Sequence, residues 1–310
     1  MKKFGMCVLS LLALSAFASA QMTLYVSKSG NDINPCTQTL PCRTFGGAIP
    51  SLSFRTPNIT ILALDSADYS QSGGTLLAAG VVIDGGAHGA FLSGPNGLPA
   101  IRLESWGTFR NLTIIPGTGA GSSGIYGTLG PGAVLTLDHV AFAAPQGNSS
   151  VAVSLSAAPT ARIDFRHVTV TGGTDGFDLA PIGPGESGPY LVSIVDSSVD
   201  VASTGISVDG GAATIRDSSV LNAVNGLIFK VSDLVTTNSI LDHTQISGDT
   251  TGLTVNAKAT VMMSYCLFSL NTVGVSLSGG ALQSFDNNAF FGNGSDGIGV
   301  VRGIYGYGMK

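Results

Sequence analysis

Residues 165–179 read FRHVTVTGGTDGFDL, and this stretch contains two short patterns that recur along the chain. The first pattern, at Phe165–Val170, has apolar residues at its first and sixth positions and a polar residue at its third, and the other three positions vary. The second, at Gly176–Leu179, is glycine, apolar, any residue, apolar. Both alternate apolar and polar side chains, which is typical of a short strand with one buried face. We therefore predict short strands in every copy of the patterns.

The two patterns repeat in phase. The first begins eight times, at Phe109, Leu137, Phe165, Ile194, Ile215, Leu241, Met263 and Phe285. These starting residues are 28, 28, 29, 21, 26, 22 and 22 positions apart. The glycine of the second pattern follows 11 or 12 residues after each of the last six starts, at Gly176, Gly205, Gly226, Gly252, Gly274 and Gly297. A constant offset at this period indicates a repeat architecture in which each copy is one coil.

Coils of this length bury an apolar face only by stacking, which pairs every strand with its equivalent in the next coil. The predicted fold class is all-β: a single-stranded right-handed parallel β-helix, or solenoid, with coils about 4.8 Å apart. The recurring glycine marks a bend where a side chain does not fit. A leucine-rich repeat has a similar period, but its Leu-x-x-Leu-x-Leu pattern is absent from the sequence.

The composition agrees with many short strands joined by tight turns, because glycine is abundant (43 of 310 residues) and only 11% of the residues are charged. The net charge of −5 and the absence of Lys/Arg clusters argue against nucleic acid as a partner. Lys2 and Lys3, the apolar run Val8–Phe17 and the small residues up to Ala20 are typical of a signal peptide. No later stretch is long enough to span a membrane. We expect a secreted or periplasmic monomer, without membrane insertion, after cleavage near Ala20.

Three cysteines remain in the expected mature chain. Cys36 and Cys42 flank a short segment in an exported protein, which predicts a local disulfide between them. Cys266 lies between apolar residues, which predicts a buried free thiol that packs as a small hydrophobe.

The N-terminal segment identifies a family resemblance. Tyr25-Val26-Ser27, Gly30-Asn31-Asp32, Asn34-Pro35-Cys36, Pro41-Cys42, Thr44-Phe45 and Ala48-Ile49 resemble the opening of secreted right-handed β-helix proteins of the pectate-lyase superfamily. The resemblance implies a first strand, a loop and a short capping helix within Arg43–Leu52. The expected organisation is therefore a signal peptide (1–20), a segment with the strand, the Cys36–Cys42 loop and the capping helix (21–56), and the β-helix (57–310).

Polar residues share two registers at the centre of the first pattern. Its second position holds, coil by coil, Arg110, Asp138, Arg166, Val195, Arg216, Asp242, Ser264 and Asp286. Its third position holds Asn111, His139, His167, Asp196, Asp217, His243, Tyr265 and Asn287. The candidate catalytic residues are Arg166, Asp196, Arg216 and Asp217, and the candidate binding residues are His167, Asp242 and His243. The alternative is a solvent-facing ladder of stacked opposite charges, which mildly stabilises paired strands.

Other chemistries fit the sequence less well. A polygalacturonase-like hydrolase needs several carboxylates around the scissile bond. Thr174–Asp178 resembles the first motif of such enzymes, but the carboxylates expected in the next coil are absent. We therefore interpret Asp175 as a turn residue. His139 and His167 are expected to be stacked neighbours, whereas His243 is too many coils away to share one ion with them. No metal site is predicted on this basis. The glycine-rich stretch Gly117–Gly132 and the segment Leu179–Pro189 are expected to be long loops.

Two functions remain open. The first is an exported, non-enzymatic β-helix that presents a surface to a glycan or a cell-surface partner and uses no cofactor. The alternative is a polysaccharide lyase acting on an acidic polysaccharide, as the pectate-lyase resemblance implies. In that reaction an arginine removes a proton, and several carboxylates bind calcium. Calcium is therefore expected as a cofactor only if the protein is a lyase. The two readings differ in whether the charged registers line a groove or an open surface.

Overall fold

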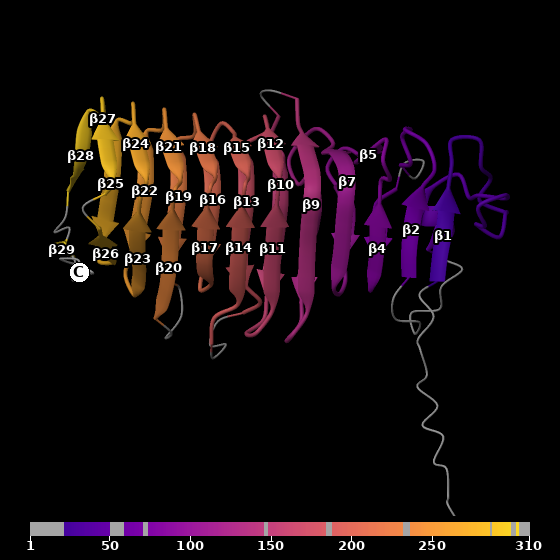
Figure 1. Ribbon diagram of the computed structural model, residues 1–310, viewed down its shortest axis with the longest axis horizontal. Coiled ribbons are helices and arrows are strands. Elements are labelled where there is room, and N and C mark those ends of the chain that lie inside the picture. Colours follow the sequence, from indigo (N-terminus) through magenta and orange to yellow (C-terminus); the bar gives the residue numbers. More distant parts are fainter. Residues whose placement is uncertain are drawn as a thin grey trace, which may run out of the picture.

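The computed structural model describes residues 22–49, 59–70, 74–145, 148–183, 188–231, 236–285, 287–298 and 302–303. Over these ranges the strands stack side by side along the long axis of the molecule, from β1 to β28 (Figure 1). All pairings between named strands are parallel, so each strand pairs with its equivalent in the next turn. The protein is a parallel β-solenoid of about nine turns. The predicted signal peptide and Asp286 lie outside the described residues.

Most turns contain three strands. The first strands of the turns are β1 (Met22–Val26), β2 (Ile59–Ala63), β4 (Val81–Asp84), β11 (Arg162–Arg166), β14 (Leu191–Val195), β17 (Ala212–Arg216), β20 (Thr237–Asp242), β23 (Ala259–Ser264), β26 (Ala281–Ser284) and β29 (Arg302–Gly303). The second strands are β5 (Ala90–Ser93), β12 (Thr169–Thr171), β15 (Ser198–Asp200), β18 (Ser219–Leu221), β21 (Gln245–Ser247), β24 (Leu267–Ser269) and β27 (Ala289–Phe291). β7 (Gly107–Ile115) and β9 (Val134–Ala143) run through both positions and join these strands into one 19-stranded sheet.

The third strands form a separate 10-stranded sheet. They are β3 (Leu76–Ala78), β6 (Pro99–Leu103), β8 (Ser123–Leu129), β10 (Val151–Ala157), β13 (Asp175–Pro181), β16 (Thr204–Asp209), β19 (Asn225–Lys230), β22 (Thr251–Asn256), β25 (Val273–Ser278) and β28 (Ser295–Ile298).

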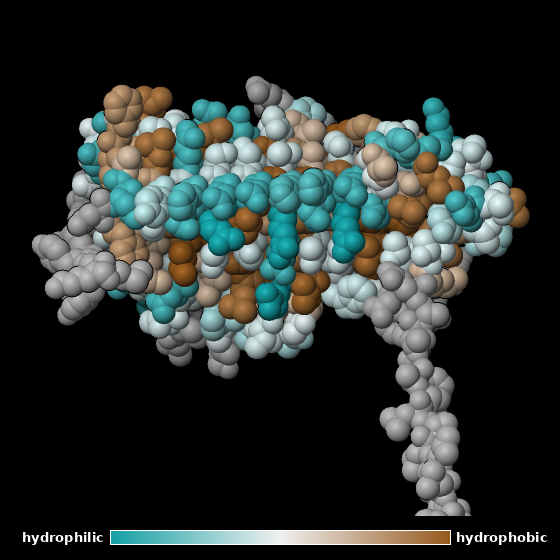
Figure 2. Space-filling model, viewed as in Figure 1, coloured by the Kyte–Doolittle hydropathy of each residue, from teal (hydrophilic) through white to brown (hydrophobic). Residues whose placement is uncertain are grey.

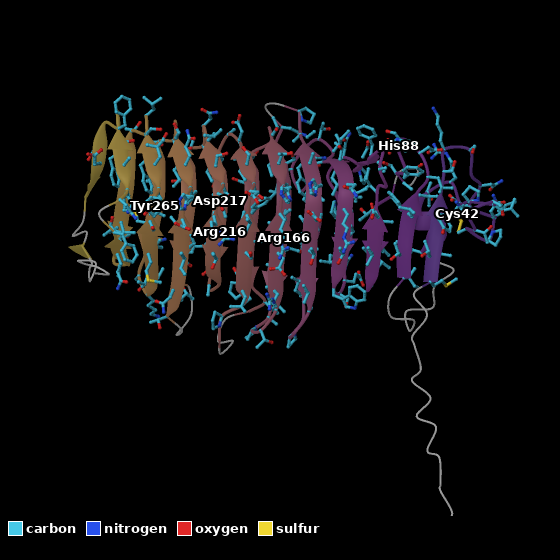
Figure 3. All side chains as sticks on the ribbon, viewed as in Figure 1. Cys42, His88, Arg166, Arg216, Asp217 and Tyr265 are labelled. Atoms are coloured by element: carbon cyan, nitrogen blue, oxygen red, sulfur yellow. A yellow bond between two sulfur atoms is a disulfide. The ribbon has the colours of Figure 1, made fainter. Side chains whose placement is uncertain are left out.

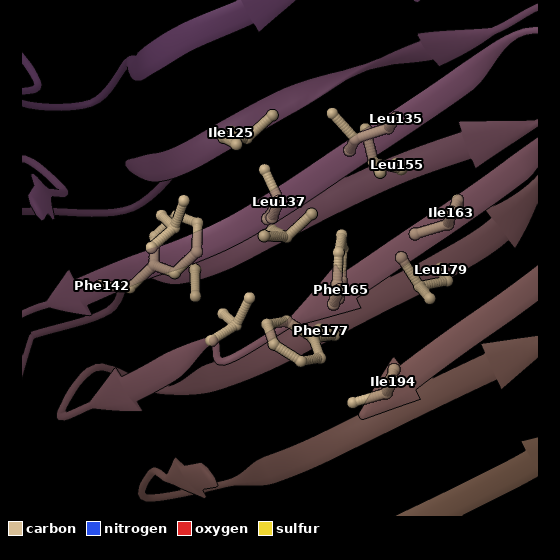
Figure 4. Close-up of a cluster of buried hydrophobic side chains, with 14 of the residues drawn as sticks. Ile125, Leu135, Leu137, Phe142, Leu155, Ile163, Phe165, Phe177, Leu179 and Ile194 are labelled. Atoms are coloured by element: carbon tan, nitrogen blue, oxygen red, sulfur yellow. The ribbon is translucent and has the colours of Figure 1, made fainter. Parts of the chain in front are cut away.

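The first apolar residue of the first pattern forms a continuous buried stack. Phe109, Leu137, Phe165, Ile194, Ile215, Leu241 and Met263 are directly paired from turn to turn, and each is fully buried. Phe177 of β13 packs edge-on against Phe165, with 4.7 Å between the ring centroids. Figure 4 shows these rings within the core between the two sheets. The predicted register is therefore confirmed over these turns.

The register shifts in the last turn. Ser284, rather than Phe285, is paired with Met263, whereas Phe290 is paired with Phe268. The prediction that Phe285 continues the stack was wrong by one residue, because one additional residue lies between the first and second strands of this turn.

The glycines of the second pattern lie where neighbouring turns come closest. A Cβ on Gly205 would be 2.5 Å from the carbonyl oxygen of Gly226, and one on Gly226 would be 2.5 Å from that of Gly252. These distances are too short for any side chain, which confirms the predicted role of the glycine. Gly297 is an exception: it is paired with Val275, so Asp296 occupies the place opposite Gly274. Gly297 was therefore wrongly assigned to this register.

The N-terminal segment supplies the first strand of the solenoid, because β1 pairs with β2 along its length. Cys36 and Cys42 form the predicted disulfide. One helical turn, α1 (Phe45–Ala48), begins after Thr44, whose Oγ1 accepts a hydrogen bond from the backbone N–H of Gly47 at 2.9 Å. The capping helix was expected within Arg43–Leu52, up to Pro50, and residues 50–58 lie outside the described part.

Two further predictions concern single segments. Cys266 is a buried free thiol, as expected. Gly117–Gly132 is not a long loop, because it contains β8. A Cβ on Gly127 would be 2.2 Å from the carbonyl oxygen of Leu103, so glycine at this position allows β8 to lie against β6. In the part of the chain that the structure describes, no helix is long and apolar enough to cross a membrane.

Candidate functional site

A left-handed bend lies between the first-strand and second-strand positions of seven successive turns, and β7 and β9 continue through it. The bend residues are Asn111, His139, His167, Asp196, Asp217, His243 and Tyr265, with φ between 47° and 53°. We call these seven residues the bend register. Asn, Asp and His are the non-glycine residues most often found in this conformation. The left-handed backbone thus favours Asn, Asp and His at the third position, and their presence there does not by itself indicate chemistry.

The predicted site residues form separate contacts along this bend. His167 Nε2 lies 3.7 Å from Asp196 Oδ2. Arg216 Nε lies 3.4 Å from Asp217 Oδ2.

A third contact lies one turn further on, where His243 Nδ1 is 3.0 Å from Asp242 Oδ1. Arg166 forms no ion pair with any described residue. Because Arg166, Val195 and Arg216 are directly paired, the two arginines are two turns, about 10 Å, apart. The structure therefore places the candidate catalytic residues along a line and does not bring them together around one point.

The line is open to solvent. The side chains of Arg216 and Asp217 are 53% and 48% exposed. Figure 2 shows a continuous hydrophilic band along the long axis of this face, and Figure 3 places Arg166, Arg216, Asp217 and Tyr265 along it. The charged registers thus lie on an outer ridge and not inside a groove.

Aromatic stacking divides the histidines as expected. The rings of His139 and His167 are stacked with 4.3 Å between their centroids, whereas His243 is stacked on Tyr265 at 4.6 Å. Asp138 contacts both members of the first pair, since its Oδ1 lies 2.8 Å from His139 Nδ1 and 3.5 Å from His167 Nδ1.

Asp175, which resembled a hydrolase carboxylate, has a structural contact. Its Oδ1 accepts a hydrogen bond from the backbone N–H of Thr204 at 3.0 Å, in the next turn. This contact supports the interpretation of Asp175 as a turn residue.

A shallow hollow of about 330 Å³ lies on the outer face of β11, β14, β17 and β20, on the N-terminal side of the bend. Small residues, among them Ser193, Ala212 and Thr214, line it. Leu191 and Ile240, which are 46% and 40% exposed, add apolar surface. Charged and amide groups come from Arg162, Asp164 and Asn238.

This hollow was not predicted, because its lining residues lie outside the positions next to the bend. The signal was present, since Arg162 and Asp164 precede Arg166 by four and two residues. Side chains at this spacing point to the same face of a strand.

The comparisons with known proteins agree with this architecture. Residues 190–305 match the family model described as "Right handed beta helix region". No curated protein matches the sequence.

Two solved structures are similar over most of this chain. The crystal structure of pectate lyase Pel9A has a TM-score of 0.54 and 13% identity, covering 84% of this chain and 78% of that chain. The GH136 lacto-N-biosidase from Eubacterium ramulus has a TM-score of 0.54 and 12% identity, covering 91% and 67%. At such identities the similarity shows the fold alone. The protein is a right-handed parallel β-helix of the pectate-lyase-like fold.

Proposed function

We propose that this protein is an exported β-helix that binds an extended glycan on its outer face and does not cleave it. The single observation that carries the proposal is the position of the hollow on β11, β14, β17 and β20 directly beside the bend register. A polymer lying along the solenoid axis would contact small and apolar side chains in the hollow and charged side chains at its edge.

The arginines favour an acidic glycan. Arg162 and Arg166 lie at the two ends of β11, and neither forms an ion pair with a described residue. Arg216 lies at the end of β17, two turns away. Guanidinium groups bind carboxylates through paired hydrogen bonds. Arg162 and Arg166 are separated along the strand and Arg166 and Arg216 along the axis, an arrangement that suits several sugar units of one chain better than a single small molecule.

The exposure of the candidate catalytic residues supports binding over cleavage. Proton abstraction next to a uronate requires a base held against the substrate in a fixed geometry, whereas the side chain of Arg216 is half exposed and, among the described residues, forms an ion pair with Asp217 alone. The names of the similar structures, a pectate lyase and a lacto-N-biosidase, support carbohydrate as the ligand class.

In this proposal α1 caps the N-terminal end of the solenoid. Phe45 is buried, and its ring lies 5.1 Å from that of Tyr69. A cap at this end would cover the apolar core and the free edge of the first turn. Export after cleavage near Ala20 is compatible with the Cys36–Cys42 disulfide.

Affinity electrophoresis of the mature chain in gels containing polygalacturonate, alginate or a neutral glucan tests the proposal. We expect retardation by at least one acidic polymer and loss of retardation in the R162A/R166A double variant. R102A is the matched control, because Arg102 is exposed, lies in the other sheet on β6 and is paired with Glu104 at 3.1 Å. Equal migration of all three proteins in every gel would overturn glycan binding by this face.

The alternative function is a polysaccharide lyase, and the contact between Arg216 and Asp217 is the observation that favours it. Release of unsaturated uronate from the same acidic polymers, with and without calcium, tests for it. Turnover by the wild type that is lost in R216Q and D217N would establish the lyase and overturn the non-enzymatic reading.

A further inference from the structure

We propose that Asp138, His139 and His167 form a binding site for a transition-metal ion such as Zn²⁺ or Cu²⁺. One ligand atom from each of these three residues can be chosen so that all three lie within 4.8 Å of one another. None of its three side chains lines the hollow.

The distances suit a tetrahedral ion. Asp138 Oδ1 lies 2.8 Å from His139 Nδ1 and 3.5 Å from His167 Nδ1. With metal–ligand bonds of about 2.0–2.1 Å, two ligand atoms of a tetrahedral zinc centre are about 3.3 Å apart. Binding therefore requires rotation of these solvent-accessible side chains to bring the three atoms to bonding distance.

The fold pre-arranges the two imidazoles. His139 and His167 occupy the bend in successive turns, with φ of 53° and 52°. Their backbones therefore project the rings in the same direction, and the rings stack with 22° between their planes. Asp138 is paired with Arg166, so its carboxylate reaches His167 as well as its own neighbour.

The ligand types define the class of ion. Imidazole nitrogens suit zinc, copper and nickel, whereas calcium and magnesium prefer sites made of oxygen atoms. Two imidazoles and one carboxylate supply three ligands, which leaves a fourth position of a tetrahedral ion for water or an external group.

Asp196 is a positioning residue in this site. Its Oδ2 lies 3.7 Å from Nε2 of His167, the ring nitrogen that does not face Asp138. At this distance the two atoms do not form a hydrogen bond. A closer approach of Asp196 when the ion binds would hold the proton on Nε2 and leave the lone pair of Nδ1 free for the metal. Carboxylates in this outer position fix the tautomer of metal-binding histidines and raise their basicity.

The bend register contains its own control. His243 Nδ1 lies 3.0 Å from Asp242 Oδ1, which reproduces the contact of His139 with Asp138. The ring stacked on His243 belongs to Tyr265 and not to a second histidine. His243 therefore has the local pair but lacks the second imidazole, and we expect it not to bind the ion.

Calorimetric titration of ZnCl₂ into the mature chain, produced without a histidine tag, tests the proposal. His→Asn is the substitution of choice, because Asn111 already occupies the same bend with φ of 53°. We expect one zinc ion per chain in the wild type and in H243N. We expect binding to weaken more than about 10-fold in H139N and in H167N, and about 10-fold in D196N.

Circular dichroism of each variant shows whether the solenoid is retained. A second readout follows the imidazole NMR signals, where zinc should shift those of His139 and His167 and leave that of His243 unchanged. The proposal is wrong if the wild type shows no saturable binding, if folded H139N and H167N bind zinc as the wild type does, or if H243N weakens binding as much as they do. Unchanged affinity in D196N would remove the positioning role of Asp196.

Discussion

The side-chain amide of Asn271 and the carboxyl of Asp249 occupy the same place in successive turns. Asn271 Oδ1 accepts a hydrogen bond from the backbone N–H of Asp249 at 2.9 Å, and Asp249 Oδ1 accepts one from that of Ala223 at 2.7 Å. Asn271 Nδ2 also donates to the carbonyl oxygen of Ile246 at 3.1 Å. Among the described residues, Asp249 Oδ2 has no corresponding partner. A protonated Asp249 can act as a donor at this place as an asparagine does.

Asp249→Asn is therefore expected to stabilise the protein at neutral and alkaline pH. Burial raises the pKa of Asp249 to about 7, although the hydrogen bond from the backbone N–H of Ala223 acts in the opposite direction. Between pH 4 and pH 7 the unfolded chain loses this proton while the folded chain keeps it, so stability falls as pH rises, by a few kcal/mol in all. Thermal melts should give D249N a Tm about 5 °C above the wild type at pH 8.

The pH dependence separates this effect from general stabilisation. At pH 3, below the ordinary pKa of 3.8, the acid is largely protonated in both states, so the Tm difference between D249N and the wild type should largely disappear. Asn271→Asp is the matched control, because it places a second acid in the next turn and should lower the Tm at pH 8. A D249N advantage that is the same at both pH values would contradict a protonated Asp249.

Tyr190→Phe is expected to destabilise the solenoid. The Tyr190 ring is buried, and its hydroxyl lies 2.8 Å from the carbonyl oxygens of both Leu179 and Asp209. Loss of this donor removes a buried hydrogen bond and should cost about 1–2 kcal/mol. Urea unfolding measures the change. Tyr265→Phe is the control, since its exposed hydroxyl forms no hydrogen bond with a described residue; similar losses in both variants would argue against the role of the Tyr190 hydroxyl.

Gly205→Ala is expected to destabilise the protein by about 2 kcal/mol, which is typical of overpacking. The added Cβ would lie 2.3 Å from Val220 Cγ1 and 2.5 Å from the carbonyl oxygen of Gly226, so neighbouring turns must separate. In Gly130→Ala the added Cβ meets no atom within 4 Å. The Tm of G205A should therefore fall and that of G130A should stay near the wild type. An unchanged Tm for G205A would show that the turns adjust freely.

Cys266 is expected to be unreactive in the folded protein. It is buried, and burial raises the pKa of its thiol, whereas thiol reagents attack the thiolate. The mature chain should react with a thiol reagent only after unfolding in denaturant, with the disulfide intact. Cys266→Ser should remove that signal with little change in Tm. Cys266 Sγ donates to the carbonyl oxygen of Ser264 at 3.4 Å, and Ser218 Oγ makes the same contact with the carbonyl oxygen of Arg216 at 2.7 Å, so a serine fits this position. Rapid labelling without denaturant is the result that contradicts burial.

The fold was predictable because its information is local and repeated. Phe165 and Gly176 each recur at nearly fixed intervals, so one copy indicates the others. Single-residue shifts were not predictable in the last turn, where Ser284 takes the place expected for Phe285. A one-residue insertion at a bend leaves both patterns recognisable while it changes the pairing on one side.

The site was less predictable, for a conformational reason. The backbone is left-handed at the third position of the first pattern, and this conformation favours Asp and His. These residues therefore resemble a functional cluster in the sequence even where they have only a structural role. Stacking of His139 on His167 followed from the register. The contribution of Asp138 did not, because a search restricted to histidines overlooks a carboxylate in the adjacent register. The hollow on β11 and β14 was missed because its lining residues, such as Ser193 and Ala212, lie outside the two registers at the bend.

The left-handed bend also bears on how new activities could arise in such proteins. Each turn tolerates Asn, Asp or His at this place, and the codons of these three residues differ by one-base changes. Side chains at successive bends are already about 4.8 Å apart. A point mutation can therefore exchange one ligand type for another on a preformed line without disturbing the core. Diversification of binding chemistry is in this way uncoupled from the evolution of stability.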